Sequence, residues 1–257
     1  MFCRWSTTFA VDISSDSSGT VAPLVPDLLY TTKNYTLRWY DKNAIILIAP
    51  RRGLSSVFAT GGVTASWYAR SLSRTGQTDC FAFNGFYFGY GGTGAKFQPA
   101  GNATISLWWQ SGTTVYSSTT DPDLDVNLGV DVSYNAINNS LSFTASKTIR
   151  RGVRFFAWPM IVSGGILNPI LVESISHRSS RHYRTFMIRR ANGKAIFGIT
   201  TKKMTLSDLG SRLQAILSTE SISVVNLDGG SSTSFWHGSY AFNPNKSIPS
   251  FFGMCER

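Results

Sequence analysis

The sequence has little charge and few residues of the kinds that form crosslinks or bind metals. Only 15% of its 257 residues are charged and 42% are hydrophobic, which excludes a disordered chain and supplies material for a core. Three cysteines argue against a disulfide framework. We interpret Cys80, in an apolar run, as a buried thiol, and a bridge between the terminal Cys3 and Cys255 stays open. Without metal-type Cys or His spacing, we expect no metal and no cofactor.

Long apolar runs are also missing. The longest, Ala44–Ala49, is far shorter than the roughly 18 residues that span a bilayer. The first residues contain no apolar region of the signal-peptide type. We therefore expect a soluble chain without a membrane partner, either intracellular, part of a larger particle, or already processed. The Ser-rich stretch Ser14–Thr20 predicts a mobile N-terminal segment over residues 1–28, followed by one domain over residues 29–257.

Aromatic residues are abundant, and Gly, Ser and Thr recur throughout, which favours a β-rich fold with many turns. Short apolar runs predict strands over residues 45–48, 64–68, 80–83, 105–109, 130–134, 141–145 and 153–158. Asn192-Gly193 predicts a hairpin between residues 186–188 and 195–199. Apolar residues at helical spacing predict a helix from Thr205 to Leu217, and residues 222–227 form a further predicted strand. Together these elements imply an α+β fold, with a mixed, β-rich sheet core and a few helices.

The formal net charge of +10 bears on the partners of the chain. A basic surface attracts phosphates, nucleic acid or anionic polymers, although a merely solvated basic surface explains the charge equally well. No signature of a nucleic-acid-binding fold is present, so we expect no specific nucleic-acid partner. The oligomeric state is left open.

The segment Asn226–Thr233 is the most informative in the chain. Asp228 stands where an apolar strand ends, and Gly229 and Gly230 let a ligand approach the backbone closely. Three hydroxyl residues follow, and backbone N–H groups in such a loop can bind phosphate. The alternative is a tight turn in which Asp228 bonds to its own backbone.

This segment resembles the Asn-Leu-Asp-Gly-Gly-Gly-Ser-Thr signature of the phosphodiester glycosidase family, with Ser231 at the third glycine. Other segments resemble family elements in the same order. Residues 81–88 resemble its Asn-Gly-Gly-Phe-Phe element, with Phe86 at the second glycine, and residues 157–165 resemble its Gly-Pro-Leu-Leu-Val segment. Residues 182–188 resemble its Arg-Thr element, and residues 204–206 resemble the start of its helix that contains Met-Thr-Leu. The resemblance covers about residues 80 to 237.

The resemblance implies hydrolysis of the glycosidic bond of a sugar 1-phosphodiester, releasing the sugar and a phosphomonoester. It implies Asp228 as nucleophile, general base or stabiliser of an oxocarbenium-like state. Arg184 is expected to hold the phosphate, and Asn84 to bind a sugar hydroxyl or orient Asp228. The expected substrate-binding residues are Gly85, His182, Thr185, Gly229, Gly230, Ser231, Ser232 and Thr233.

Several alternatives stay open at this point. Asp79 and Glu173 are further candidate carboxylates. Residues 121–127 alternate oxygen ligands as a calcium loop does, but Val126 replaces the required Gly, so we predict an acidic surface loop. Because Phe86 and Ser231 depart from the family pattern, the second functional hypothesis is a non-catalytic glycan- or phosphate-binding module of a larger assembly.

Overall fold

The structure is a computed structural model. It describes residues 26–73, 79–86, 88–91, 96–101, 106–109, 114–117, 119–120, 129–143, 152–169, 180–238 and 240–256. The β-rich character predicted from composition is confirmed, and the described residues include two α-helices, α1 (Ala65–Leu72) and α2 (Leu206–Ile216). Neither helix in these ranges has the length and apolar character needed to cross a membrane. The acidic loop at residues 121–127 and Glu173 lie outside the described residues.

The largest sheet has eight strands, and each pairs with its neighbours in antiparallel fashion. Their order is β1 (Leu28–Thr31), β2 (Tyr35–Tyr40), β3 (Ile45–Pro50), β17 (Ala195–Thr200), β16 (Thr185–Arg189), β18 (Ser223–Asn226), β14 (Met160–Ser163) and β15 (Ile166–Leu167). The predicted hairpin is confirmed as β16 and β17, with Gly193 at a φ of 76° in its turn.

Three smaller sheets complete the described structure. The first has the order β20 (Tyr240–Phe242), β19 (Phe235–His237), β5 (Cys80–Asn84), β21 (Ile248–Cys255) and β4 (Ser55–Val63). The second has the order β12 (Ser140–Ser142), β11 (Val130–Asn135), β13 (Gly152–Ala157), β8 (Ser106–Trp109) and β9 (Thr114–Ser117). The third has the order β10 (Thr119–Thr120), β7 (Lys96–Gly101) and β6 (Phe88–Gly91). Strands β5, β8, β11 and β13 were predicted within one residue of their bounds, whereas β4, β19, β20 and β21 were not predicted.

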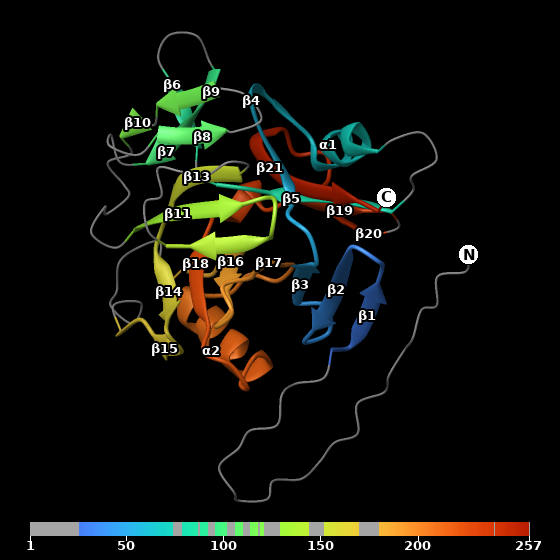
Figure 1. Cartoon of the computed structure of the whole chain (residues 1–257), viewed down its shortest axis with the longest axis vertical. Coiled ribbons are helices and arrows are strands. Elements are labelled where there is room, and N and C mark those ends of the chain that lie inside the picture. The colour runs from blue at the N-terminus through green and yellow to red at the C-terminus, as the bar shows by residue number, and fades with distance from the viewer. Residues whose placement is uncertain are drawn as a thin grey trace, which may run out of the picture.

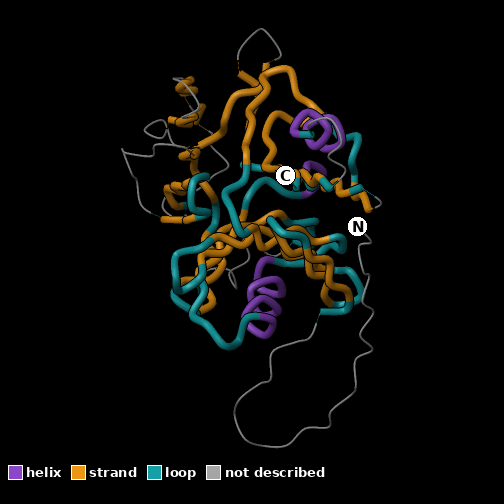
Figure 2. The backbone as a smooth tube through the Cα atoms, turned by 45° about the vertical axis from the view of Figure 1, so that its right-hand side comes forward, coloured by secondary structure: helices purple, strands orange, loops and turns teal. Residues whose placement is uncertain are grey.

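The apolar side chains form layers on both faces of the eight-stranded sheet. Along β3, Ile46 and Ile48 face a core shared with the two five-stranded sheets, whereas Ile45 and Leu47 face α2. Successive strand residues point to opposite faces, so a continuous apolar run is expected where both faces are covered. Figures 1 and 2 show α2 under the large sheet and α1 at the opposite end of the molecule.

Helix α2 begins where the sequence predicts. The Thr205 hydroxyl accepts a hydrogen bond from the backbone N–H of Asp208 at 3.0 Å, which satisfies one of the free donors of the first turn. Leu206, Leu209 and Leu213 are fully buried against the sheet. Burial of each such side chain contributes roughly 1.5–3 kcal/mol, so this face secures the helix.

The strand predicted over residues 64–68 is wrong, because this segment begins α1. Thr64 is the N-cap, and its hydroxyl accepts a hydrogen bond from Trp67 N at 3.1 Å. Ala65, Tyr68 and Ala69 are buried at helical spacing, while Trp67 is 56% exposed. Thr, Trp and Tyr favour strands locally, but packing of this face against β5 and β21 decides for the helix.

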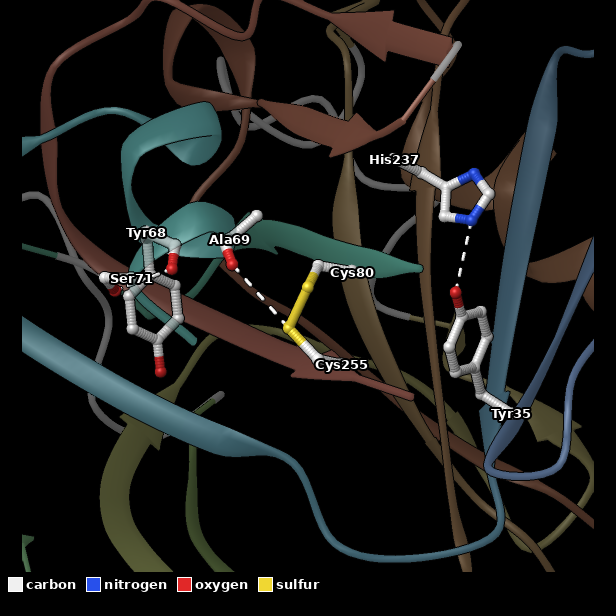
Figure 3. The surroundings of a disulfide bond; sticks show 7 residues. All are labelled: Tyr35, Tyr68, Ala69, Ser71, Cys80, His237 and Cys255. Carbon is white, nitrogen blue, oxygen red and sulfur yellow. Dashed lines mark hydrogen bonds between the residues drawn. A yellow bond between two sulfur atoms is a disulfide. The ribbon is translucent and has the colours of Figure 1, made fainter. Parts of the chain in front are cut away.

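The interpretation of the cysteines is also wrong. Cys80 is no free thiol: it forms a disulfide with Cys255 between β5 and β21, where the two residues are direct cross-strand partners. Figure 3 shows this bond beside α1, with Cys255 Sγ near the carbonyl of Ala69. Because Cys255 is used, the alternative bridge to Cys3 is overturned as well, and Cys3 lies outside the described residues. The sequence places these partners 175 residues apart, too far for local patterns to pair them.

Candidate functional site

The segments with candidate catalytic residues meet where strands of two sheets end. Strand β16 begins at Thr185 beside the end of β18, because the two strands are antiparallel and Phe186 lies opposite Asn226. One further backbone bond, from Leu227 N to Thr185 O at 2.7 Å, extends this pairing to the residue before Asp228. Strand β5 of the other sheet ends at Asn84, which reaches the same place.

Asn84 joins the two sheets at this point. It is fully buried, and its Nδ2 donates to the backbone carbonyl of Asp228 at 2.6 Å. Its Oδ1 accepts from the Thr185 hydroxyl at 2.7 Å and from Ser234 N at 3.1 Å. Of the two expected roles for Asn84, these contacts favour orientation of the Asp228 loop over contact with a sugar hydroxyl. Thr185 is likewise buried, and its hydroxyl is used in the hydrogen bond to Asn84.

Asp228 has a strongly perturbed carboxylate. Burial raises the pKa of Asp228 from 3.8 to about 7, although hydrogen bonds from the Ser232 side chain and Gly229 N–H, and the charge of Lys246, favour the ionised form. Its Oδ2 is buried and has no hydrogen-bond partner among the described residues. A carboxylate that is half ionised near neutral pH and keeps an unused buried oxygen is typical of a reactive site.

The glycine-rich loop after Asp228 packs tightly against the chain before β16. A Cβ on Gly229 would lie 2.8 Å from the carbonyl oxygen of Tyr183, so only glycine fits there without a shift. Gly230 has a φ of 60° and donates its N–H to the same carbonyl at 2.7 Å. A short 3-10 helix, η4 (Gly230–Ser232), follows. Ser231, at the third glycine position of the family signature, is exposed and has no positive φ, so its side chain is accommodated without backbone strain.

The loop uses several of its N–H groups internally, contrary to the expectation that they would be free for phosphate. Ser232 N donates to Gly229 O at 3.1 Å, and Thr233 N donates to Gly230 O at 3.4 Å. The Thr233 hydroxyl oxygen, by contrast, is buried without a partner among the described residues. These two N–H groups therefore do not form a nest of free donors for an anion.

Arg184 lies directly beside this loop but is largely enclosed. It is 5% exposed, its Nε donates to Met204 O at 3.2 Å, and a terminal nitrogen donates to Ser180 O at 2.8 Å. These bonds hold the guanidinium on two backbone carbonyls, while the Cα of Arg184 lies 3.6 Å from the position that a Cβ on Gly229 would take. His182 is half-buried, and its Nε2 lies 2.7 Å from the Ser180 hydroxyl. Its Nδ1 faces Gly230, 3.9 Å from the position a Cβ would take.

Two other predicted residues serve packing. Gly85 N donates to Ser250 O at 2.8 Å, and a Cβ on Gly85 would lie 2.2 Å from the Ser250 hydroxyl. Phe86 is 2% exposed, and its ring stacks on Phe155 with the centroids 4.9 Å apart. The departure from the family pattern at Phe86 therefore fills the core, and its side chain is directed away from the site.

The remaining candidate carboxylates within the described residues lie elsewhere. Asp79 precedes Cys80 at the opposite end of β5 from Asn84, and its carbonyl accepts from Glu256 N at 2.8 Å. Asp208 lies 3.4 Å from Arg181 in an exposed ion pair. In the described ranges, no group of three or more His, Cys, Asp or Glu side chains is arranged to hold a metal ion.

Sequence reasoning missed three contributors to the site. Lys246 lies near enough to Asp228 for its positive charge to lower the pKa of the Asp228 carboxyl, against the larger effect of burial. Ser250 accepts hydrogen bonds from both residues after Asn84. Its carbonyl accepts from Gly85 N at 2.8 Å, and its hydroxyl accepts from Phe86 N at 3.0 Å. Tyr183 supplies the carbonyl that receives the glycine loop. Lys246 and Ser250 follow the family signature in segments with no motif, so only the pairing of β20 with β19 and of β21 with β5 could reveal them.

Comparison with known proteins agrees with this arrangement. The model of the phosphodiester glycosidase family matches residues 81–254, more than half of the chain. The chain belongs to the phosphodiester glycosidase family. The matched region contains both strand ends of the candidate site and the glycine-rich loop of the family signature. No curated protein matches the chain significantly.

Solved structures are similar to this chain only at low sequence identity. The catalytic domain of zebrafish N-acetylglucosamine-1-phosphodiester alpha-N-acetylglucosaminidase, auto-inhibited by its pro-peptide, is 14% identical, with a TM-score of 0.50 over 87% of this chain and 78% of that one. A hypothetical protein from Synechocystis is 13% identical, with a TM-score of 0.49 over 88% of this chain. The present chain spans 63% of the length of that Synechocystis chain.

Proposed function

We propose that the chain hydrolyses the glycosidic bond of a sugar 1-phosphodiester, releasing the sugar and a phosphomonoester. The observation that carries this proposal is the half-buried Asp228 of the family's signature loop, whose carboxylate has a pKa of about 7 and a buried Oδ2 with no hydrogen-bond partner among the described residues. The zebrafish glycosidase of similar fold acts, by its name, on an N-acetylglucosamine 1-phosphodiester. This similarity makes sugar 1-phosphodiesters the first substrate class to test.

The proposed chemistry requires less acid catalysis than ordinary glycoside hydrolysis. Cleavage at the anomeric carbon expels a phosphate monoester, which leaves without full protonation. The site must then supply a carboxylate toward the anomeric centre and positive charge toward the departing phosphate. Asp228 supplies the first through its carboxylate, Lys246 acts on the charge of that carboxylate, and Arg184 is proposed to supply positive charge toward the phosphate.

Asn84 is proposed as a positioning residue. It holds the Asp228 carbonyl at 2.6 Å while Thr185 and Ser234 fix its own amide oxygen. A shift of a reacting carboxylate by about 1 Å from its productive position can lower the rate about 100-fold. Loss of Asn84 should therefore lower kcat more than it raises KM.

The test is release of free sugar and phosphomonoester, detected by mass spectrometry, from a panel of sugar 1-phosphodiesters. The panel includes nucleotide sugars and a polymer of glycosyl phosphates. We expect turnover by the wild type and its loss in Asp228→Asn and Arg184→Ala. Asp41→Asn is the matched control, because Asp41 is a surface carboxylate paired with Arg212. Full turnover by Asp228→Asn on a verified substrate would sink the assignment of Asp228.

The second candidate function is binding of a glycan or phosphate without turnover. It is favoured by one observation, the use of Arg184 donors and loop N–H groups in internal hydrogen bonds. Salt-resistant retention of a glycosyl phosphate by the wild type, with no product from any member of the panel, would select this function over hydrolysis.

A further inference from the structure

An aromatic pair borders the glycine-rich loop on the side of Tyr183. The carbonyl of Tyr183 accepts the Gly230 N–H at 2.7 Å, so the backbone of this residue is fixed against the loop. Its ring meets the ring of Phe242 from β20 edge to face, with centroids 5.0 Å apart and planes at 68°. Both side chains are half-buried, which leaves part of each ring facing solvent.

A cation lies over the Tyr183 ring of this pair. The Lys203 ammonium lies 5.7 Å from the centroid of the Tyr183 ring, a distance at which the ring attracts it. Lys203 lies in the connection between β17 and α2, which is tied to the chain before Tyr183 by two bonds between His182 and Met204 at 2.9 and 3.2 Å. The ammonium therefore has a defined place relative to the loop.

The charge around this position is unbalanced. Lys202 and Lys203 are exposed, and no salt bridge between described residues involves either of them. The neighbouring acid Asp208 is paired with Arg181 at 3.4 Å. Cations without acidic partners around one loop attract an anion with more than one charge.

We propose that Lys203, held over the Tyr183 ring and assisted by Lys202, binds a second phosphate located in the aglycone of the substrate. This inference rests on the proposed function and narrows its substrate class to sugar phosphodiesters with a further phosphate beyond the scissile one, as in a polymer of glycosyl phosphates. The exposed ring surface packs against the hydrocarbon part of the aglycone between the two phosphates.

The experiment compares two probes, of which only one carries the second phosphate. One is the methyl diester of N-acetylglucosamine 1-phosphate, and the other is its diester with glycerol 3-phosphate. Binding is measured by calorimetry with the uncleavable C-glycosyl phosphonate analogue of each, and turnover is measured with the diesters themselves. The variants are Lys202→Met with Lys203→Met, Lys203→Arg, and Lys33→Met as a control that removes an exposed lysine from the β1–β2 turn.

We expect the wild type to bind the analogue of the glycerol 3-phosphate diester about fivefold more tightly than the analogue of the methyl diester. This difference in affinity should shrink as salt is added. The double Met variant should lose this preference, whereas Lys203→Arg and Lys33→Met should keep it. Equal binding of both analogues by the wild type, or a preference that survives in the double Met variant, would overturn the subsite.

The two readouts separate the subsite from the reaction. Hydrolysis of the methyl diester combined with equal binding of the analogues means that the proposed function stands and the subsite fails. A lysine-dependent binding preference with no hydrolysis of either diester means that the subsite stands and the reaction assignment fails.

Discussion

The raised pKa of Asp228 predicts that substitution of this residue by Asn stabilises the protein near neutral pH. The folded chain favours the protonated carboxyl, since burial moves its pKa from 3.8 to about 7. Between these values the unfolded chain releases the proton and the folded chain retains it, so the free energy of unfolding falls as pH rises. Stability from this group is fully present below the unfolded pKa of 3.8 and is lost as pH rises through about 7.

The size of the effect follows from the shift. A difference of about three pKa units corresponds to roughly 4 kcal/mol of stability lost between about pH 4 and about pH 8. Asp228→Asn cannot ionise and so avoids this loss. Its new amide nitrogen replaces the buried Oδ2 and costs about 1–3 kcal/mol without a partner, but this cost does not vary with pH.

The assay is urea unfolding of the wild type and Asp228→Asn at intervals from about pH 4 to about pH 8, with the difference between the two free energies as the result. This difference removes the contributions of all other titrating groups, including His237. We expect the difference to change in favour of Asp228→Asn by a few kcal/mol over this range. A difference that stays constant with pH, or that moves in favour of the wild type, would refute a pKa raised by burial.

Three more predictions concern other parts of the molecule. Replacement of Cys80 and Cys255 by Ala should lower the free energy of unfolding by about 5 kcal/mol, because the bond closes a loop with a sequence separation of 175, and non-reducing urea unfolding checks it. Burial lowers the pKa of His237 from 6.5 to about 4, so the fold holds the neutral ring and the free energy of unfolding falls as pH falls through this range. His237→Gln should reduce this loss of unfolding free energy. Urea unfolding of this variant across that range, with a slope equal to the wild type's, would contradict it. Gly229→Ala should lower kcat/KM more than about tenfold, because its Cβ would lie 2.8 Å from a backbone oxygen, whereas Asp41→Asn, at a surface carboxylate outside the site, should keep wild-type kinetics.

The local pattern of the sequence determined the elements that depend on neighbouring residues. Helix α2 follows from the spacing of its leucines and from Thr205 at its N-cap, and the hairpin of β16 and β17 follows from a glycine that takes a positive φ. The signature around Asp228 lies at the end of a strand, as the apolar run before it predicted. These features are readable because capping, helical periodicity and turn conformations act over only a few residues.

Only the tertiary structure decided the features that depend on distant partners. Packing against β5 and β21 stabilises helix α1, although Trp67 and Tyr68 in it favour strands. Pairing of the same two strands brings Cys80 to Cys255. Asn84 meets Asp228 across a sequence separation of 144, and its backbone contact favours a positioning role that its own neighbours could not indicate. The pKa of Asp228 is likewise a property of its burial. A sequence records which groups are available, but desolvation and long-range contacts arise only when the sheets close over them.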